Sequence, residues 1–198
     1  VSFRSLQKIM ISAILLAAGQ SKRMNGKNKL TKEIKGIPLI KHSIRNILDS
    51  SIDELIIVLG FEKEIIKNLI NENKKIKFDI NKNYENGLAS SIKTGLNHLS
   101  DNTKAFFICL GDMPMVNPNI YNKLILSMKK NEIIIPTYKG QQRNPILFSK
   151  TMKEKVIEIN GDTGAKKILE NKKNKILKIE IDDENIFKDF NTKDNFSS

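Results

Sequence analysis

The sequence has little cysteine, little arginine and no long apolar run. It contains one Cys in 198 residues, which excludes an intramolecular disulfide framework and disfavours a cysteine-based metal site. A membrane-spanning helix needs about 20 consecutive apolar residues, and no run in the sequence approaches that length. These absences favour a globular chain without a membrane partner.

Charge is the most unusual part of the composition. The chain has 34 Lys and Arg against 22 Asp and Glu, a net charge of +12, which indicates a polyanionic partner. Only four of the basic residues are Arg, however. Lys, Ile and Asn, whose codons are A/T-rich, fill 83 positions, so we interpret much of the Lys excess as a bias of genome composition. Base readout and bidentate phosphate contacts depend on Arg, so we expect no nucleic-acid partner.

The length of 198 residues suggests one domain. Met10 directly precedes the first strand pattern, so we expect residues 1–9 to be an N-terminal extension and residues 10–196 to form a single domain. Residues 1–9 lack the apolar segment of roughly 7–15 residues that a secretory signal needs. Together with the lone thiol, this favours a cytoplasmic location.

Short apolar runs alternate with helical patterns along most of the chain. This alternation is typical of a mostly parallel sheet covered on both faces, and it predicts a Rossmann-like three-layer α/β/α sandwich. Ligands of such folds bind beyond the carboxyl ends of the strands. The expected strands are 11–17, 54–60, 76–80, 105–110, 132–136, 144–148, 176–181 and 186–190, the last two at an edge or of mixed direction, and the expected helices are 38–50, 63–71, 88–99, 118–130, 150–159 and 163–171.

The loop after the first strand carries small and basic residues. Residues 15–30 read LLAAGQSKRMNGKNKL, in which the small residues let a ligand approach the backbone and its N–H groups. Arg23 and Lys29 add positive charge at the same place, which suits a polyphosphate. Neither a Walker A loop nor a G-x-G-x-x-G fingerprint is present.

The same loop resembles the LAAGxSxRMGxxK signature of the MobA-like nucleotidyltransferases, and it is most similar to the molybdenum cofactor cytidylyltransferases. The resemblance implies the fold of the nucleotide-diphospho-sugar transferases and gives Arg23 and Lys29 catalytic roles on the leaving pyrophosphate. Lys29 stands one residue further from Arg23 than in the signature, so Lys27 is an alternative. The resemblance implies nucleotide binding by Leu16, Ala17, Ala18, Gly19, Arg23, Lys29, Gly87 and Asp112.

Asp112 follows the buried run 105–110 in the string GDMP. A carboxylate at the end of a buried strand faces the ligand crevice and suits Mg²⁺, which binds one or two carboxylates together with substrate phosphates. The string also resembles the family, in which this Asp holds the metal. The DFNTKD string resembles the family's end motif and implies Asn191 as the second metal ligand, with Asp189 as the alternative.

The resemblance implies transfer of CMP from CTP to molybdenum–molybdopterin with release of pyrophosphate, with Mg²⁺ as cofactor. Ala18 is part of this inference, because guanylyl-transferring relatives read LAGG where this chain reads LAAG. The product would pass to a partner such as a molybdenum hydroxylase apo-enzyme. The alternatives are the same chemistry on a sugar phosphate or phospho-alcohol, a non-catalytic cofactor carrier, and a basic nucleic-acid-binding protein.

Overall fold

A computed structural model describes residues 9–21, 28–128, 130–161, 166–171, 175–183 and 190. Its centre is an eight-stranded sheet in the order β10-β7-β9-β6-β1-β4-β5, with β8 paired to β7. The pairs between β1, β4, β5 and β6 and between β7 and β10 are parallel, whereas β8 and β9 run antiparallel to their neighbours. The strands are β1 (Met10–Ala17), β4 (Glu54–Leu59), β5 (Ile76–Ile80), β6 (Thr103–Leu110), β7 (Ile133–Tyr138), β8 (Gln141–Gln142), β9 (Ile146–Ser149) and β10 (Ile176–Glu180).

β1 shows why a continuous apolar run becomes a central strand. Side chains alternate between the two faces of a strand, so Ala13 and Leu15 enter one hydrophobic core while Ile14 and Leu16 enter the other. All four are buried. A strand buried on both faces needs apolar residues at every position, which is what residues 11–17 provide.

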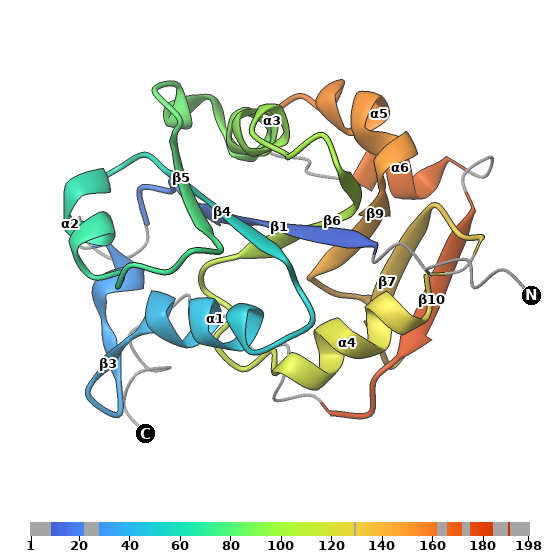
Figure 1. The fold of residues 1–198 in the computed structure, drawn as a ribbon, viewed down its shortest axis with the longest axis horizontal. Helices are drawn as coiled ribbons and strands as arrows, with labels where there is room; N and C mark the ends of the chain where they lie inside the picture. Colours follow the sequence, from blue (N-terminus) through green and yellow to red (C-terminus); the bar gives the residue numbers. More distant parts are fainter. Residues whose placement is uncertain are drawn as a thin grey trace, which may run out of the picture.

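Helices cover both faces of the sheet (Figure 1). The core that contains Leu15 also holds residues of α1 (Leu39–Leu48), α2 (Lys63–Asn68) and α4 (Pro118–Leu126). The core that contains Ile14 holds residues of α3 (Leu88–Asn97), α5 (Lys153–Ile157) and α6 (Lys166–Glu170). The predicted three-layer α/β/α sandwich with a mostly parallel sheet is therefore confirmed.

Several predicted bounds differ from the structure. α1, α2, α3 and α4 each end two to four residues before the predicted ends. A small hairpin of β2 (Glu33–Ile34) and β3 (Ile37–Pro38), with Lys35 and Gly36 at positive φ, was not expected. The predicted extension 1–9 and strand 186–190 lie outside the described residues, apart from Ile9 and Phe190.

Polar side chains tie four strands together at the amino-terminal edge of the sheet. Glu54, which begins β4, is 3% exposed and accepts a hydrogen bond from Ser12 Oγ of β1 at 2.8 Å. It also pairs with Lys77 of β5 and accepts from Ser100 Oγ. Ser12 in turn hydrogen-bonds Thr103 of β6 at 2.8 Å. This network fixes the register of the strands at the edge opposite to their carboxyl ends.

In the part of the chain that is described, every helix is too short or too polar to cross a membrane.

Candidate active site

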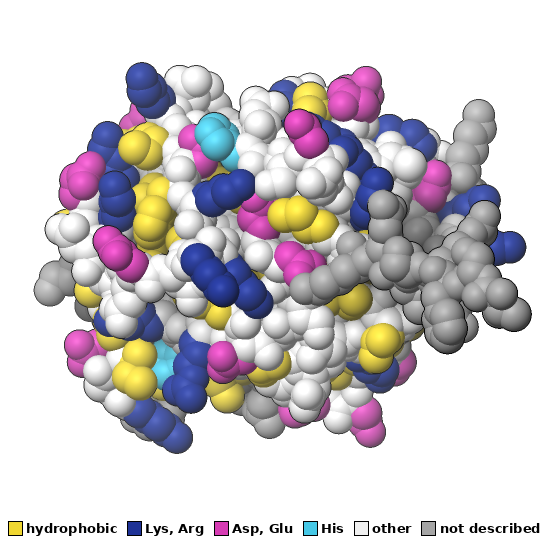
Figure 2. Space-filling view, viewed as in Figure 1, with side chains coloured by type: hydrophobic (Ala, Val, Ile, Leu, Met, Phe, Trp, Pro, Cys, Tyr) yellow, Lys and Arg dark blue, Asp and Glu magenta, His cyan; other side chains and the backbone are white. Residues whose placement is uncertain are grey.

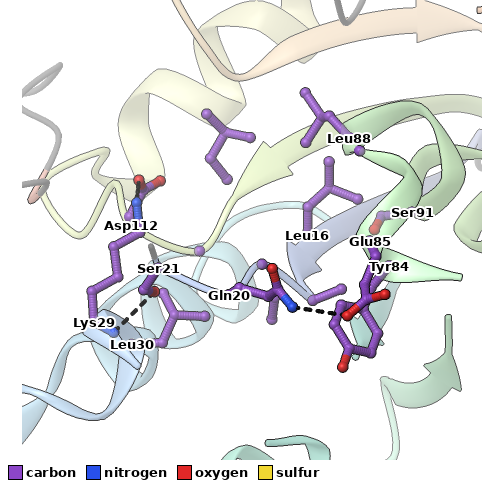
Figure 3. A pocket seen from close by; sticks show the side chains of 16 residues that line it. Leu16, Gln20, Ser21, Lys29, Leu30, Tyr84, Glu85, Leu88, Ser91 and Asp112 are labelled. Atoms are coloured by element: carbon purple, nitrogen blue, oxygen red, sulfur yellow. Dashed lines mark hydrogen bonds and ion pairs between the residues drawn. The ribbon is translucent and has the colours of Figure 1, made fainter. Parts of the chain in front are cut away.

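A pocket of about 500 Å³ lies at the carboxyl edge of the sheet, where β1 and β6 end side by side. The loop after β1 forms its floor, and the segment that leads into α3 forms one wall (Figure 3). Seven of the eight residues expected to bind nucleotide line this pocket. The eighth, Arg23, lies outside the described residues. Those seven are Leu16, Ala17, Ala18, Gly19, Lys29, Gly87 and Asp112.

The pocket floor is held by backbone contacts among three strand ends. The carbonyl of Ala18 accepts from the amide of Phe61 at 3.1 Å, and the carbonyl of Leu16 accepts from the amide of Gly111 at 3.1 Å. A Cβ on Gly60 would lie 2.7 Å from the Cβ of Ala18. Gly60 therefore lets the end of β4 approach the floor closely, a requirement that the sequence pattern did not single out.

Lys29 is held by its backbone at the beginning of a short 3₁₀ helix, η2 (Lys29–Thr31). Its amide donates to Ser21 Oγ at 3.1 Å, and the side chain of the preceding Asn28 accepts from the amide of Leu30 at 3.1 Å. From this anchored backbone the Lys29 side chain reaches into the pocket, where its ammonium forms an ion pair with the carboxylate of Asp112 (Figure 3). The alternative, Lys27, lies outside the described residues.

The loop that carries Asp112 is fixed by α1 and by Phe190. Ser43 Oγ of α1 donates to the carbonyl of Gly111 at 3.0 Å, and Asn46 Nδ2 donates to the carbonyl of Pro114 at 2.8 Å. The carbonyl of Asp112 accepts from the amide of Phe190 at 3.3 Å. Phe190 is the sequence neighbour of both Asp189 and Asn191, the two candidate metal ligands, which lie outside the described residues.

The wall before α3 depends on a glycine and a buried amide. Gly87 has φ +89°, in a region that favours glycine, and it leads directly into α3. Asn81 is buried, and its Nδ2 donates to Ser90 Oγ at 2.8 Å and to Ser91 Oγ at 3.0 Å. Asn81 was not among the residues predicted from the sequence, although its position directly after the third expected strand was a usable signal.

Gln20 and Glu85 connect the floor to this wall. Gln20 Nε2 donates to Glu85 Oε1 at 3.1 Å, and both residues line the pocket at the end away from Asp112 (Figure 3). The pocket thus has a charged end at Lys29 and Asp112 and a polar end at Gln20 and Glu85. Neither Gln20 nor Glu85 was predicted from the sequence to belong to the site.

The donor set at the charged end fits a divalent cation that arrives with phosphates. Among the residues that the structure describes, no three His, Cys, Asp or Glu side chains gather into a metal cage. Of the described residues that line the pocket, Asp112 is the one that supplies a carboxylate to the charged end. One or two carboxylates together with substrate phosphates and waters can hold a divalent cation such as Mg²⁺, and Asp112 fits that kind of site.

The chain is similar to known proteins in sequence and in fold. The family model that describes the MobA-like NTP transferase domain matches residues 13–176. The bifunctional protein GlmU of Staphylococcus epidermidis is 23% identical over 142 residues, which are 71% of this chain and 31% of GlmU. The chain therefore spans about a third of the length of that curated relative.

Solved structures share the fold at low sequence identity. Rv0371c of Mycobacterium tuberculosis superposes with a TM-score of 0.80 at 22% identity over 88% of this chain and 89% of that chain. The same protein has also been solved in complex with manganese. The 4-diphosphocytidyl-2C-methyl-D-erythritol synthase of Anaerococcus prevotii superposes with a TM-score of 0.77 at 19% identity over 95% and 93% of the two chains. Since the family model covers most of the sequence, the chain belongs to the MobA-like NTP transferase family.

Proposed function

We propose that the protein transfers a nucleotidyl group from a nucleoside triphosphate to a phosphorylated acceptor and releases pyrophosphate. The observation that carries the proposal is the meeting of Lys29 and Asp112, 83 positions apart in the sequence, at one end of a pocket with a small-residue floor. A cation and a carboxylate on an open backbone floor are suited to a polyphosphate and its counter-ion. Family membership supports the same chemistry.

In the proposed reaction, an oxygen of the acceptor phosphate attacks the α-phosphorus. The bond from the α-phosphorus to the bridging oxygen breaks, and pyrophosphate leaves with that electron pair. Lys29, together with Arg23, stabilises the negative charge that develops on the leaving pyrophosphate. Positioning and electrostatic stabilisation supply most of the catalysis in such a reaction.

We propose that Asp112 holds a divalent cation, with Asn191 or Asp189 as a second ligand. Mg²⁺, or Mn²⁺ in its place, would neutralise charge on the triphosphate when bound. Asp112 is suited to this role because its backbone is fixed by Phe190 and its neighbour Gly111 is fixed by Ser43. The manganese complex of Rv0371c supports a divalent metal in this fold.

For the substrates, we propose CTP and molybdenum–molybdopterin, with delivery of the product to a molybdenum hydroxylase apo-enzyme. The support is the LAAG string at residues 16–19, together with the DFNTKD string at residues 189–194. The alternative is the same transfer to a sugar phosphate or phospho-alcohol. It is supported by the A. prevotii synthase and by an inositol-1-phosphate CTP transferase of T. maritima with a TM-score of 0.66.

The charge distribution supports a small polyanion as the ligand. On the face seen in Figure 2, Lys and Arg side chains are interspersed with Asp and Glu side chains and do not form one continuous basic stripe. A nucleic-acid-binding surface usually gathers its basic residues in a patch or stripe. The proposed ligand is therefore a nucleoside triphosphate.

The test is pyrophosphate release by the purified chain with CTP, GTP, ATP or UTP, Mg²⁺ and each acceptor class. We expect turnover with CTP, and loss of at least a hundredfold in kcat for Asp112→Ala. Asp101→Ala, which removes an exposed carboxylate just before the opposite end of β6, should behave like wild type. Full activity of Asp112→Ala with CTP and molybdenum–molybdopterin would contradict the assignment of this site.

A further inference from the structure

The ion pair between Lys29 and Asp112 has a consequence for how a metal reaches the site. The two side chains are 21% and 13% exposed, and the ammonium contacts the carboxylate oxygen Oδ2. The polypeptide by itself thus neutralises the carboxylate proposed as a metal ligand. A second cation at Asp112 would meet the first one within a few ångströms, in a pocket where water screens only part of the repulsion.

We propose that Lys29 and a divalent cation compete for the Asp112 carboxylate, so that the metal enters efficiently only as its complex with the nucleoside triphosphate. The triphosphate would draw the ammonium away from Asp112 and at the same time deliver the metal to it. This inference rests on the proposed function, because it takes the triphosphate as the group that Lys29 contacts next.

The structure identifies which partner can move. The carbonyl of Asp112 is bonded to the amide of Phe190, and Ser43 Oγ and the carbonyl of Leu16 both bond to the adjacent Gly111. The backbone of Lys29 is likewise fixed through Ser21. Lys29, however, carries its ammonium on a flexible four-carbon stem. The exchange therefore needs rotation of the flexible Lys29 side chain.

The donor set explains why the competition is effective. Within the described part of the chain, no further His, Cys, Asp or Glu side chains combine with Asp112 into a group of three that could hold a metal. From these described side chains, a free dication that displaces the ammonium would gain no compensating cluster of negative charge. The triphosphate supplies that negative charge, so we infer that metal and nucleotide bind with positive coupling.

The test is a titration of the full chain with Mn²⁺ alone, followed by the EPR signal of free Mn²⁺. We expect weak binding to wild type and binding about tenfold tighter, equivalent to about 1.4 kcal/mol, for Lys29→Met. Lys29→Gln is the second neutral variant should Lys29→Met fail to fold, as judged by its melting curve. Lys29→Arg keeps the positive charge and should bind Mn²⁺ as weakly as wild type.

Two control variants separate the pair from general charge effects. Lys104→Met removes the same charge from the amino-terminal half of β6, at an exposed position, and should leave Mn²⁺ affinity unchanged. Adding Asp112→Asn to Lys29→Met should remove the gain. The inference is overturned if neutral Lys29 variants that melt like wild type bind Mn²⁺ no more tightly, or if Lys104→Met gains as much.

The same proteins distinguish this inference from the proposed function. If wild type releases pyrophosphate from CTP but the Lys29 variants gain no Mn²⁺ affinity, the competition is wrong and the proposed function stands. If the neutral variants gain Mn²⁺ affinity but no nucleoside triphosphate is turned over, the competition stands and the proposed function is wrong.

Discussion

Gly95 places α3 against the sheet more closely than any other residue type would allow. A Cβ at this position would lie 2.3 Å from Cγ2 of Ile14 and 3.1 Å from Cγ2 of Val58. Both contacts belong to buried residues of β1 and β4. Because their branched side chains are stiff at χ1, relief must come from movement of the helix. We therefore expect Gly95→Ala to push α3 outward.

The size of the effect follows from two opposing terms. Extra volume in a packed core typically costs about 1–3 kcal/mol, and a contact as short as 2.3 Å places this site at the upper end. Replacing Gly by Ala within a helix contributes about 1 kcal/mol in the opposite direction. We expect a net loss of about 2 kcal/mol, which corresponds to a fall in Tm of roughly 4–8 °C for a chain of this size.

Thermal and urea unfolding followed by circular dichroism would measure this loss. Asn97→Ala, at an exposed position of the same helix, tests helix propensity without the core contact and should be neutral or slightly stabilising. In an Ile14→Ala background the contact with Cγ2 is absent, so Gly95→Ala should cost nothing there. The coupling would be about 2 kcal/mol. A Gly95→Ala protein as stable as wild type would refute the reasoning from close packing.

Three further outcomes are expected. Burial tends to raise the pKa of Glu54, but hydrogen bonds from Lys77, Ser100 and Ser12 outweigh it, and the folded pKa lies below the usual 4.5. The stabilisation by Glu54 is therefore complete above pH 4.5 and is lost as the pH falls through the lowered pKa. Urea midpoints should show Glu54→Gln less stable than wild type at pH 7, by about 1–3 kcal/mol, with a gap that narrows in acid. Burial raises the pKa of the Cys109 thiol to about 12, so it should react with a thiol reagent only after unfolding; fast labelling of the native protein would contradict this. Gly60→Ala would press on Ala18 in the pocket floor, and calorimetry should show nucleotide affinity at least tenfold weaker, whereas unchanged affinity would count against the close approach.

Much of the fold could be predicted from local patterns. The continuous apolar run of β1 indicated a strand buried on both faces, and the alternation of strands and helices predicted the layers. The antiparallel insertion of β9 between β6 and β7 was not predictable in this way. The apolar pattern of residues 146–149 would suit a parallel or an antiparallel strand equally well. The direction of the strand is set by its connections and by packing against segments that are distant in the sequence.

The candidate site shows the same division. That Gly19, Lys29 and Asp112 line one pocket was predictable, because small, basic and acidic residues follow strands in a recognisable order. That Lys29 contacts Asp112 directly was not predicted, since each had been assigned to a different part of the ligand. The close packing at Gly60 and Gly95 was not predicted either, because it depends on residues that are distant in the sequence, namely Ala18 and Ile14.

The network around Glu54 lies at the amino-terminal edge of the sheet, whereas the pocket lies at the carboxyl edge. The register of these strands is therefore fixed at the edge of the sheet away from the ligand. A segment at the pocket end, such as residues 81–87, can change in length or sequence without disturbing that network. This separation makes the chain a suitable host for loop exchange: loops of a relative with another acceptor could be grafted onto it while Ser12, Glu54 and Thr103 stay untouched.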